Sequence, residues 1–292
     1  MKYSIHNRYR TLITQFLLSS LLLITIPALA VEPSPLKKSD APSFSFGVVP
    51  QQSAKRLAIL WGPMLNYLSE KTGIKLQFKT AKNIPTFEKR LANGEYDFAY
   101  MNPYHFVVYN NKPGYKAIAV RKNQPISGII VTRKDSSIRS LNALSEKTLA
   151  FPSPAAFAAS ILPQAELNNR GVTFKSKYVS SHDSVYLAVA KGLIPAGGGV
   201  KRTFNNTPKE VREKLTVLWI SKKHTPHAFA THPRVKDTTY KAIQNALINM
   251  GEDKIGKEIL LSLKLKHGLI TAKDSDWNDV RDLNIKLLEE GK

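Results

Sequence analysis

The 292-residue chain contains no cysteine and has few acidic residues for its number of basic ones. Without a thiol there is no disulfide framework, thiolate zinc site, cysteine nucleophile or thioether-linked lipid anchor. The chain carries 22 Asp plus Glu against 43 Lys plus Arg, so its formal net charge is +21 at pH 7. A surplus of this size is typical of proteins that bind nucleic acid, a membrane surface or small anions.

The sequence signatures of common enzyme classes are also missing. There is no Walker lysine loop, no G-x-S-x-G elbow and no H-E-x-x-H pair. The histidines beyond residue 100 never recur at i, i+4, the spacing that places two imidazoles on one helical face for a metal. We therefore predict that the chain is not an enzyme and that it uses no metal and no cofactor.

The first thirty residues read as a secretory signal peptide. Lys2, Arg8 and Arg10 precede an apolar run over residues 16–26, which is followed by Ala28-Leu-Ala30. That run is shorter than the roughly 20 apolar residues that span a bilayer, although an N-terminal anchor is the alternative. We expect cleavage near Ala30 and export to the bacterial periplasm without a lipid anchor, where nucleic acid is not an expected partner.

After residue 30 the chain alternates strand patterns with helix patterns. Strands are expected over residues 44–49, 74–78, 96–101, 128–132, 147–151 and 216–220, with another ending at Tyr178-Val179. Helices are expected from Ser53 to Gly73, over residues 85–91, and from Asn102-Pro103, Ser153-Pro154, Ser181 and the capping box Thr207-Pro-Lys-Glu210, with the chain mostly helical after Pro226. This alternation predicts an α/β protein with mostly parallel sheets, in two lobes with a cleft between them.

Several predicted helix starts converge on one part of this fold. Ser53, Asn102, Ser153 and the turn at 181–183 each follow a strand and begin a helix. In open α/β sheets ligands lie beyond the carboxyl ends of the strands, and the free N–H groups of a helix start favour anions. Capping alone explains any single one of these residues, so it is their convergence that predicts an anion site.

Two histidines and a glycine run fall near the expected cleft. A protonated imidazole of His182 or His227 would donate to an anion, and a packed or solvated loop histidine is the alternative for each. Gly197-Gly-Gly199 is expected to follow a strand, either approaching a ligand closely or forming a plain turn. Basic pairs such as Lys201-Arg202 are scattered, which indicates solvated faces and a diffuse positive field that would speed the arrival of an anion.

Four segments carry a resemblance to a known family. They are Phe46-Gly-Val-Val-Pro-Gln-Gln52, Trp61 with Tyr67-Leu-Ser-Glu-Lys-Thr-Gly73, Tyr96-Asp-Phe-Ala-Tyr-Met-Asn-Pro103 and His182-Asp-Ser-Val-Tyr186. In their order and spacing they resemble the phosphate/phosphite/phosphonate-binding proteins of ABC importers. The resemblance implies a two-lobed periplasmic binding protein of type 2 topology. A flexible leader (31–43) would precede lobe 1 (44–126 and 226–292) and lobe 2 (127–225).

The resemblance also implies where the ligand binds. An aromatic residue at the position of Tyr100 lines the pocket in the family, and a hydroxyl-rich helix start after Ser153 cradles the phosphonate. Here the hydroxyls are replaced by alanine and Phe157, the pocket tyrosine by Ile84, and a carboxylate by Pro195. The expected ligand-binding residues are Gln51, Tyr100, Asn102, Ser153, Ala155, Ala156, Phe157, His182, Ser184 and His227.

The sequence therefore predicts a monomeric periplasmic solute-binding protein of an ABC importer. It would capture a phosphonate, phosphite, phosphate or related small oxyanion by hinge closure and present the closed form to a permease in the inner membrane. The altered pocket leaves the ligand open. The alternative is a ligand sensor whose closed form is presented to a membrane sensor kinase, and a periplasmic hydrolase would need a nucleophile and a base in the cleft.

Overall fold

The computed structural model describes residues 43–285, 287 and 288. The predicted signal peptide and nearly all of the predicted leader therefore lie outside the described residues. In the part of the chain that is described, no helix is long and apolar enough to cross a membrane.

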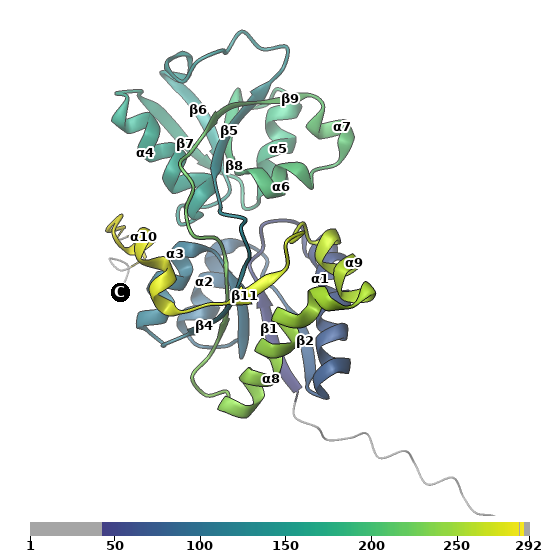
Figure 1. Ribbon diagram of the computed structural model, residues 1–292. Coiled ribbons are helices and arrows are strands. Elements are labelled where there is room, and N and C mark those ends of the chain that lie inside the picture. The colour runs from purple at the N-terminus through teal and green to yellow at the C-terminus, as the bar shows by residue number, and fades with distance from the viewer. Residues whose placement is uncertain (1–42, 286, 289–292) are drawn as a thin grey trace, which may run out of the picture. The chain divides into compact units, whose positions relative to one another are not determined.

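The strands form two separate sheets, one of six strands and one of five (Figure 1). The first sheet has the order β11-β4-β10-β3-β1-β2, with bounds β1 Ser43–Val48, β2 Lys75–Lys79, β3 Phe98–Met101, β4 Lys116–Arg121, β10 Ala228–Thr231 and β11 Leu269–Thr271. The second sheet has the order β7-β6-β8-β5-β9, with bounds β5 Gly128–Arg133, β6 Lys147–Phe151, β7 Phe174–Tyr178, β8 Ala196–Val200 and β9 Leu215–Ile220.

Both sheets are mixed, so the expectation of mostly parallel sheets is wrong. In the first sheet β1 pairs in parallel with β2 and β3, whereas β10 runs antiparallel to β3 and β4. In the second sheet β6 pairs in parallel with β7 and β8, whereas β5 runs antiparallel to β8 and β9. β11 also runs antiparallel to β4. Strands β5 and β10, which take part in most of the antiparallel pairs, each directly follow a segment that crosses from the other sheet.

Helices cover both faces of the first sheet. Helices α1, α8 and α9 pack on one side and α2, α3 and α10 on the other (Figure 1).

The bounds of the helices that accompany both sheets are α1 Ala54–Thr72, α2 Ile84–Ala92, α3 Pro103–Asn111, η1 Asn142–Leu144, η2 Phe157–Ile161, α4 Leu162–Asn169, α5 His182–Ala190, α6 Lys201–Asn205, α7 Lys209–Arg212, α8 Asp237–Ile248, η3 Asn249–Glu252, α9 Lys254–Ser262, η4 Asp274–Trp277 and α10 Asn278–Arg281.

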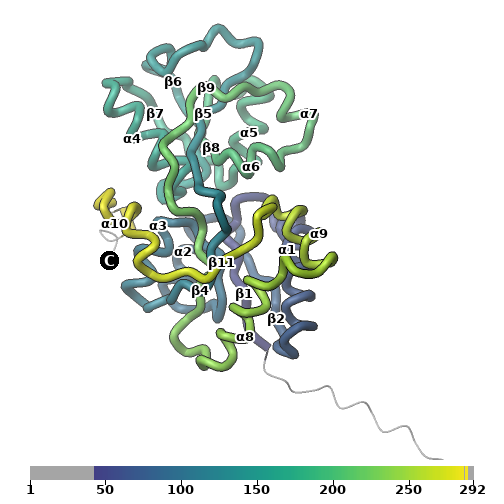
Figure 2. The backbone as a smooth tube through the Cα atoms, in the orientation of Figure 1, coloured from purple at the N-terminus to yellow at the C-terminus, as the bar shows by residue number. Residues whose placement is uncertain are grey.

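Two segments connect the sheets and run side by side. The chain leaves the first sheet through residues 122–127 and returns through residues 221–227, as the tube in Figure 2 traces. Ile126 and His224 form an antiparallel bridge between the two segments, and the indole Nε1–H of Trp277 donates to the Pro226 carbonyl at 2.8 Å. The returning segment is thereby fixed against α10 and η4.

The best-predicted element is α1. Ser53 caps it, because its hydroxyl accepts from the Arg56 N–H, and Gly73 ends it with φ at +69°. The caps predicted at Asn102 and Ser181 are confirmed as well. The capping box predicted at Thr207 is wrong, since Pro208 occupies the cap position of the four-residue helix α7 without a side-chain cap bond.

The segment after Pro226 was expected to be mostly helical, but it begins with strand β10. Its sequence, Ala-Phe-Ala-Thr, is four residues long and too alanine-rich for a clear alternating pattern. This strand lies between β3 and β4, and His227 immediately precedes it, so the missed strand bears directly on the site.

The glycine run is inside a strand rather than after one. Gly197, Gly198 and Gly199 form the middle of β8. A Cβ at Gly198 would lie 1.9 Å from the Ala159 carbonyl oxygen, and a Cβ at Gly128 on neighbouring β5 would lie 2.1 Å from the Ala158 carbonyl oxygen. The glycines therefore allow the backbone of η2 to pack directly on the sheet, which is a different role from the ligand approach or turn that we expected.

Candidate functional site

A small buried cavity is lined by residues that follow strands of both sheets. Gln51 follows β1, Asn102 follows β3 and His182 follows β7, so the cavity lies where the carboxyl ends of strands meet. The space that a water-sized sphere can occupy is about 10 Å³, which holds about one water molecule. The lining residues are Val49, Gln51, Ile84, Asn102, Ile126, Ala156, Phe157, Ala158, Ala159, His182, Val200 and His227.

Six of the ten residues predicted to bind ligand line this cavity: Gln51, Asn102, Ala156, Phe157, His182 and His227. The other four do not line it. Tyr100 is buried one layer behind, with its ring stacked on His227 at 4.9 Å. Ser184 is exposed, and its N–H donates to the cap hydroxyl of Ser181.

The helix predicted to begin at Ser153-Pro154 begins later. The chain first makes a tight turn, in which the Ala156 N–H donates to the Ser153 carbonyl at 3.3 Å, and η2 then starts at Phe157. The Asn102 side chain holds this turn by donating from Nδ2 to the Ala155 carbonyl at 3.2 Å. Ser153 is therefore not a cap, and its hydroxyl is buried without a hydrogen-bond partner.

The cavity still receives free backbone donors from this segment. The first N–H groups of a helix have no partner within the helix, and η2 runs directly into α4 to give a continuous helical segment over residues 157–169. Phe157, Ala158 and Ala159 provide these groups at the cavity wall. The N–H of Ala156, which we expected to contribute, is already occupied by the turn.

His182 is fixed by a buried network of hydroxyls. Its Nδ1 lies 3.0 Å from the Thr203 hydroxyl, which in turn lies 2.9 Å from the Tyr186 hydroxyl. Both hydroxyls also lie close enough to donate to the Val200 carbonyl, at 3.0 and 3.1 Å. The network occupies Nδ1 and leaves Nε2 as the ring nitrogen available to a ligand.

His227 faces the cavity from the first sheet. It is 2% exposed, and its Nε2 has no hydrogen-bond partner. An unpaired buried polar atom costs about 1–3 kcal/mol, so this nitrogen is a strong candidate for a ligand contact.

Both cavity histidines are neutral at pH 7. Burial, followed by the charge of Arg202, lowers the pKa of His182 to about 3. Burial, followed by the charges of Arg202 and Arg121, lowers the pKa of His227 well below its ordinary value. The protonated imidazoles that we expected from the sequence are therefore absent from the site in this state.

Two arginines behind the cavity were missed as candidates. Arg202, on α6, donates from Nη2 to the Gln51 side-chain oxygen at 2.8 Å, and its guanidinium lies 5.8 Å from the ring centre of Tyr100. Arg121, at the end of β4, is 7% exposed and donates to the Pro125 carbonyl at 2.7 Å. Arg202 follows strand β8, so the rule that ligands lie at carboxyl strand ends would have found it.

Residues that follow strands of the two sheets also contact one another directly beside the cavity. The His182 N–H donates to the Gln51 carbonyl at 2.9 Å, and the Asn102 amide reaches Ala155 as described above. Gln51 therefore accepts from the second sheet twice, through its backbone carbonyl and through its side chain.

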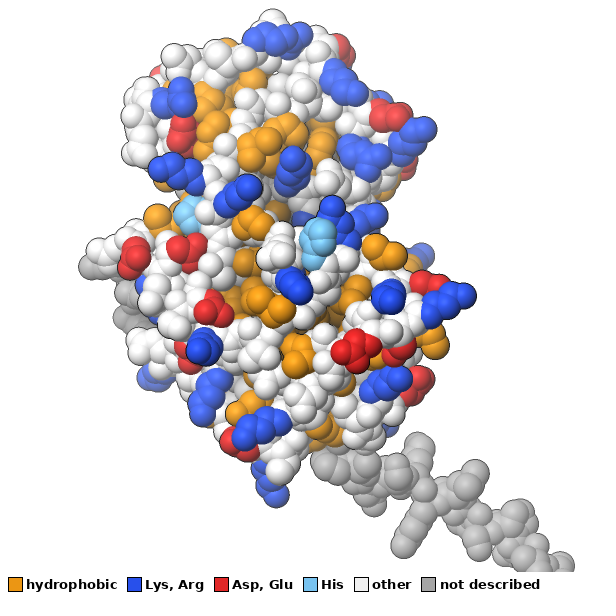
Figure 3. All heavy atoms as spheres, in the orientation of Figure 1, with side chains coloured by type: hydrophobic (Ala, Val, Ile, Leu, Met, Phe, Trp, Pro, Cys, Tyr) orange, Lys and Arg blue, Asp and Glu red, His pale blue; other side chains and the backbone are white. Residues whose placement is uncertain are grey.

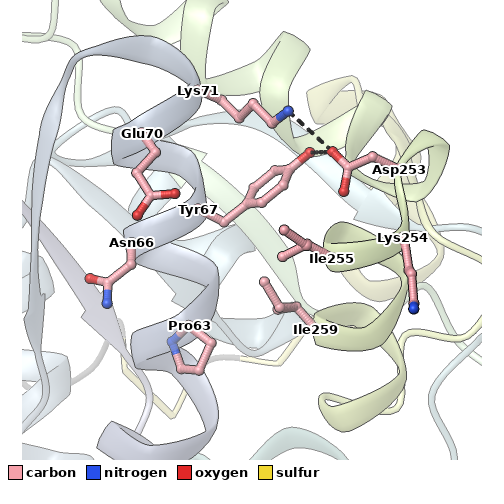
Figure 4. Close-up of a pocket in the computed structure, with 9 residues that line it drawn as sticks. All are labelled: Pro63, Asn66, Tyr67, Glu70, Lys71, Asp253, Lys254, Ile255 and Ile259. Carbon is pink, nitrogen blue, oxygen red and sulfur yellow. Dashed lines mark hydrogen bonds and ion pairs between the residues drawn. The ribbon is translucent and has the colours of Figure 1, made fainter.

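A larger hollow of about 630 Å³ lies between α1 and α9, and its residues are drawn in Figure 4. Its central polar groups bind one another, because the Tyr67 hydroxyl donates to Asp253 at 2.6 Å and Lys71 Nζ lies 3.3 Å from the same carboxylate. Since these groups are already paired, they do not converge on a ligand, and we assign the site to the smaller cavity between the sheets.

Comparisons with known proteins identify the family of the chain. A sequence model of the family described as ABC transporter, phosphonate, periplasmic substrate-binding protein matches residues 46–277. The chain is 21% identical over 276 residues to the phosphate-import protein PhnD of Mycolicibacterium smegmatis, with 82% of this chain and 84% of that protein covered. It is 22% identical over 303 residues to the probable ABC transporter phosphite binding protein PhnD1 of Prochlorococcus marinus, with 93% and 97% covered.

A solved structure of PhnD1 from Prochlorococcus marinus in complex with methylphosphonate has the same fold. Its TM-score to this chain is 0.77 at 19% identity, covering 84% of this chain and 98% of that one. The likeness confirms the predicted α/β fold of a two-lobed periplasmic binding protein.

Proposed function

Because the chain belongs to the family of periplasmic substrate-binding proteins of phosphonate ABC transporters, we propose that it captures a small oxyanion in the cavity between its two sheets. The observation that carries the proposal is the meeting of Gln51, His182 and His227 at one buried cavity, together with the N–H groups that begin η2. Hydrogen-bond donors fixed in advance around a small cavity are what oxyanion recognition requires.

His182 acts in this proposal as a neutral donor. The network of Thr203 and Tyr186 allows two arrangements of its protons, and an anion favours the one that places hydrogen on Nε2 of His182. In that arrangement Tyr186 donates to the Val200 carbonyl and Thr203 donates to Nδ1. Thr203 and Tyr186 are then positioning residues, which hold the imidazole in the tautomer that an anion can use.

The size of the cavity favours compact ligands. It has room for about one water molecule, so even a small oxyanion requires some movement of its walls. Phe157 and Ile84, which stand where the resemblance implies a hydroxyl and a tyrosine, restrict the space. Of the ligands named for the relatives, phosphite and phosphate therefore suit this chain better than an alkylphosphonate.

A thermal-shift screen tests the proposal. The protein lacking residues 1–30 is titrated with phosphite, phosphate, methylphosphonate and ethylphosphonate. A ligand at 100 times its Kd stabilises by about 2.7 kcal/mol, which raises the Tm by about 5–10 °C for a chain of this size. We expect a shift that decreases as the substituent grows. No shift with any of these anions contradicts the proposal.

The remaining predictions about the biological context stay proposals. We expect a periplasmic, signal-cleaved monomer that delivers its ligand to an inner-membrane ABC permease and catalyses no reaction. Light scattering tests the oligomeric state, and turnover of phosphate esters would contradict the absence of catalysis. The alternative partner, a membrane sensor kinase, would use the same cavity, so the neighbouring genes distinguish the two roles better than binding does.

A further inference from the structure

The residues that line the cavity carry no formal charge at pH 7. None of the twelve is Lys, Arg, Asp or Glu, and the pKa values of both lining histidines lie below their ordinary range. Moving an oxyanion from water into such surroundings without a countercharge costs several kcal/mol. A cation behind the wall would offset this cost in addition to the hydrogen-bond donors.

Arg202 is placed to supply this positive charge. Its guanidinium is one hydrogen bond behind the cavity, because the Gln51 side chain that accepts from it at 2.8 Å lines the wall. A guanidinium has five N–H donors, and this bond uses one of them. Its charge already acts on the cavity, since it lowers the pKa of both His182 and His227.

This cation has no acidic partner in the part of the chain that the structure describes. Within the described residues neither Arg202 nor Arg121 forms an ion pair with a carboxylate. Burial lowers the pKa of Arg121 to about 10, opposed by Tyr100 and assisted by the charge of Arg202, so the Arg121 side chain remains charged at pH 7. The Nε of Arg121 is also buried without a partner. Two arginines therefore lie beside the cavity without a carboxylate partner among the described residues.

We infer that Arg202 is the ligand-binding residue that supplies the countercharge, and that a ligand oxygen replaces the Gln51 side-chain oxygen as its acceptor. The inference rests on the function proposed above. The planar guanidinium fork suits an oxyanion, which offers two oxygens side by side. Recognition would then depend on the charge of the ligand as well as on its size.

The test compares two variants that remove the same charge from adjacent positions. Arg202→Gln removes the inferred contact, whereas Lys201→Gln removes one positive charge from an exposed side chain. Lys and Arg side chains are spread over the face shown in Figure 3 rather than gathered there, so the loss of one exposed cation changes the general field only slightly. Calorimetric titration with phosphite, phosphate and methylphosphonate measures Kd for each protein.

We expect Arg202→Gln to weaken binding by about 10- to 150-fold, the range for one charged hydrogen bond. Lys201→Gln should change Kd by less than about 2-fold. Arg202→Lys keeps the positive charge but lacks the planar guanidinium, so its Kd should lie between those of wild type and Arg202→Gln. If Arg202→Gln does not fold, the Kd of Arg202→Lys tests the role of Arg202. The role of Arg202 is contradicted if Arg202→Gln and Lys201→Gln have equal Kd values. If Arg202→Gln does not fold, the role is contradicted by a wild-type Kd for Arg202→Lys. Wild-type protein that binds none of the anions contradicts the proposed function itself.

Discussion

The contact between η2 and strand β8 predicts that the substitution Gly198→Ala is strongly destabilising. The added Cβ would lie 1.9 Å from the Ala159 carbonyl oxygen and 2.7 Å from the Phe151 ring. Contacts under 3.0 Å essentially never occur for a Cβ, so the backbone oxygen must move by about 1 Å or more. Ala159 lines the cavity, and the movement would therefore change the site as well as the core.

The magnitude follows from two opposing effects. Replacing glycine by alanine within a strand gains about 0.5–1 kcal/mol because the unfolded chain loses freedom. Overpacking a core costs about 1–3 kcal/mol and more where backbone must shift. Since the obstructing atom is a main-chain oxygen rather than the end of a flexible side chain, the cost dominates. With the cost at the upper end of its range, about 3 kcal/mol, the net loss is about 2–2.5 kcal/mol, which lowers the Tm by about 4–10 °C.

The matched control is Gly62→Ala in helix α1. A Cβ at Gly62 meets no atom within 4 Å, and alanine is favoured over glycine in a helix by about 1 kcal/mol. In urea denaturation and thermal melts, Gly62→Ala should therefore raise the free energy of unfolding and the Tm, whereas Gly198→Ala should lower both. A Tm of Gly198→Ala within about 1 °C of wild type would refute the tight packing of η2 on β8.

Three further predictions concern the site. Phe157→Ala should lower the free energy of unfolding by about 3–5 kcal/mol, and it should allow ethylphosphonate to stabilise the protein as well as phosphite does. If the thermal shifts of the anions keep the same order as in wild type, the assignment of Phe157 to the cavity wall is contradicted. Thr203→Val should weaken phosphite binding by about 3- to 10-fold in calorimetry, because it removes the partner of His182 Nδ1, and an unchanged Kd excludes the positioning role. Between pH 6.5 and 4 the unfolded chain protonates His182 while the folded chain, with its pKa of about 3, does not. His182 should therefore lower the free energy of unfolding by about 3 kcal/mol over this pH range. If urea titrations show the same loss between pH 6.5 and 4 for wild type and His182→Gln, His182 is not buried in its neutral form.

The parts of the fold that local patterns determine were predictable. Helix α1 follows from its apolar spacing and from caps at Ser53 and Gly73, and Asn102-Pro103 marks α3 in the same way. Strand β10 was not predictable by these means, because four residues carry too little periodicity and its place in the sheet depends on the crossing segment before it. The direction in which each strand joins its sheet depends on distant segments, so local patterns did not predict the mixed sheets.

The site was partly predictable for a related reason. Convergence of strand ends brought Asn102 and His182 together as expected, whereas Ser53 and Ser153 do not line the cavity. The pattern of Ser153-Pro154 indicated a helix start, but the turn held by Asn102 delays the helix to Phe157 and replaces the expected donors by later ones. A sequence pattern cannot give this delay, because it depends on a contact between residues 53 positions apart.

Burial explains the remaining differences. Whether His182 is charged depends on how completely it is enclosed, and whether Arg202 is a solvated cation or a site residue depends on the Gln51 side chain beside it. Both are properties of packing between distant segments. The dipeptide Lys201-Arg202 looks in sequence like many other exposed basic pairs, but its second member donates to Gln51, which lines the cavity.

A crystal structure of the protein with bound phosphite tests the central claim most directly. We predict the anion in the cavity between the two sheets, within hydrogen-bond distance of His182 Nε2 and of the Arg202 guanidinium, with Gln51 no longer bound to Arg202. An anion bound elsewhere, for example in the hollow between α1 and α9, with the cavity between the sheets unchanged, would contradict it.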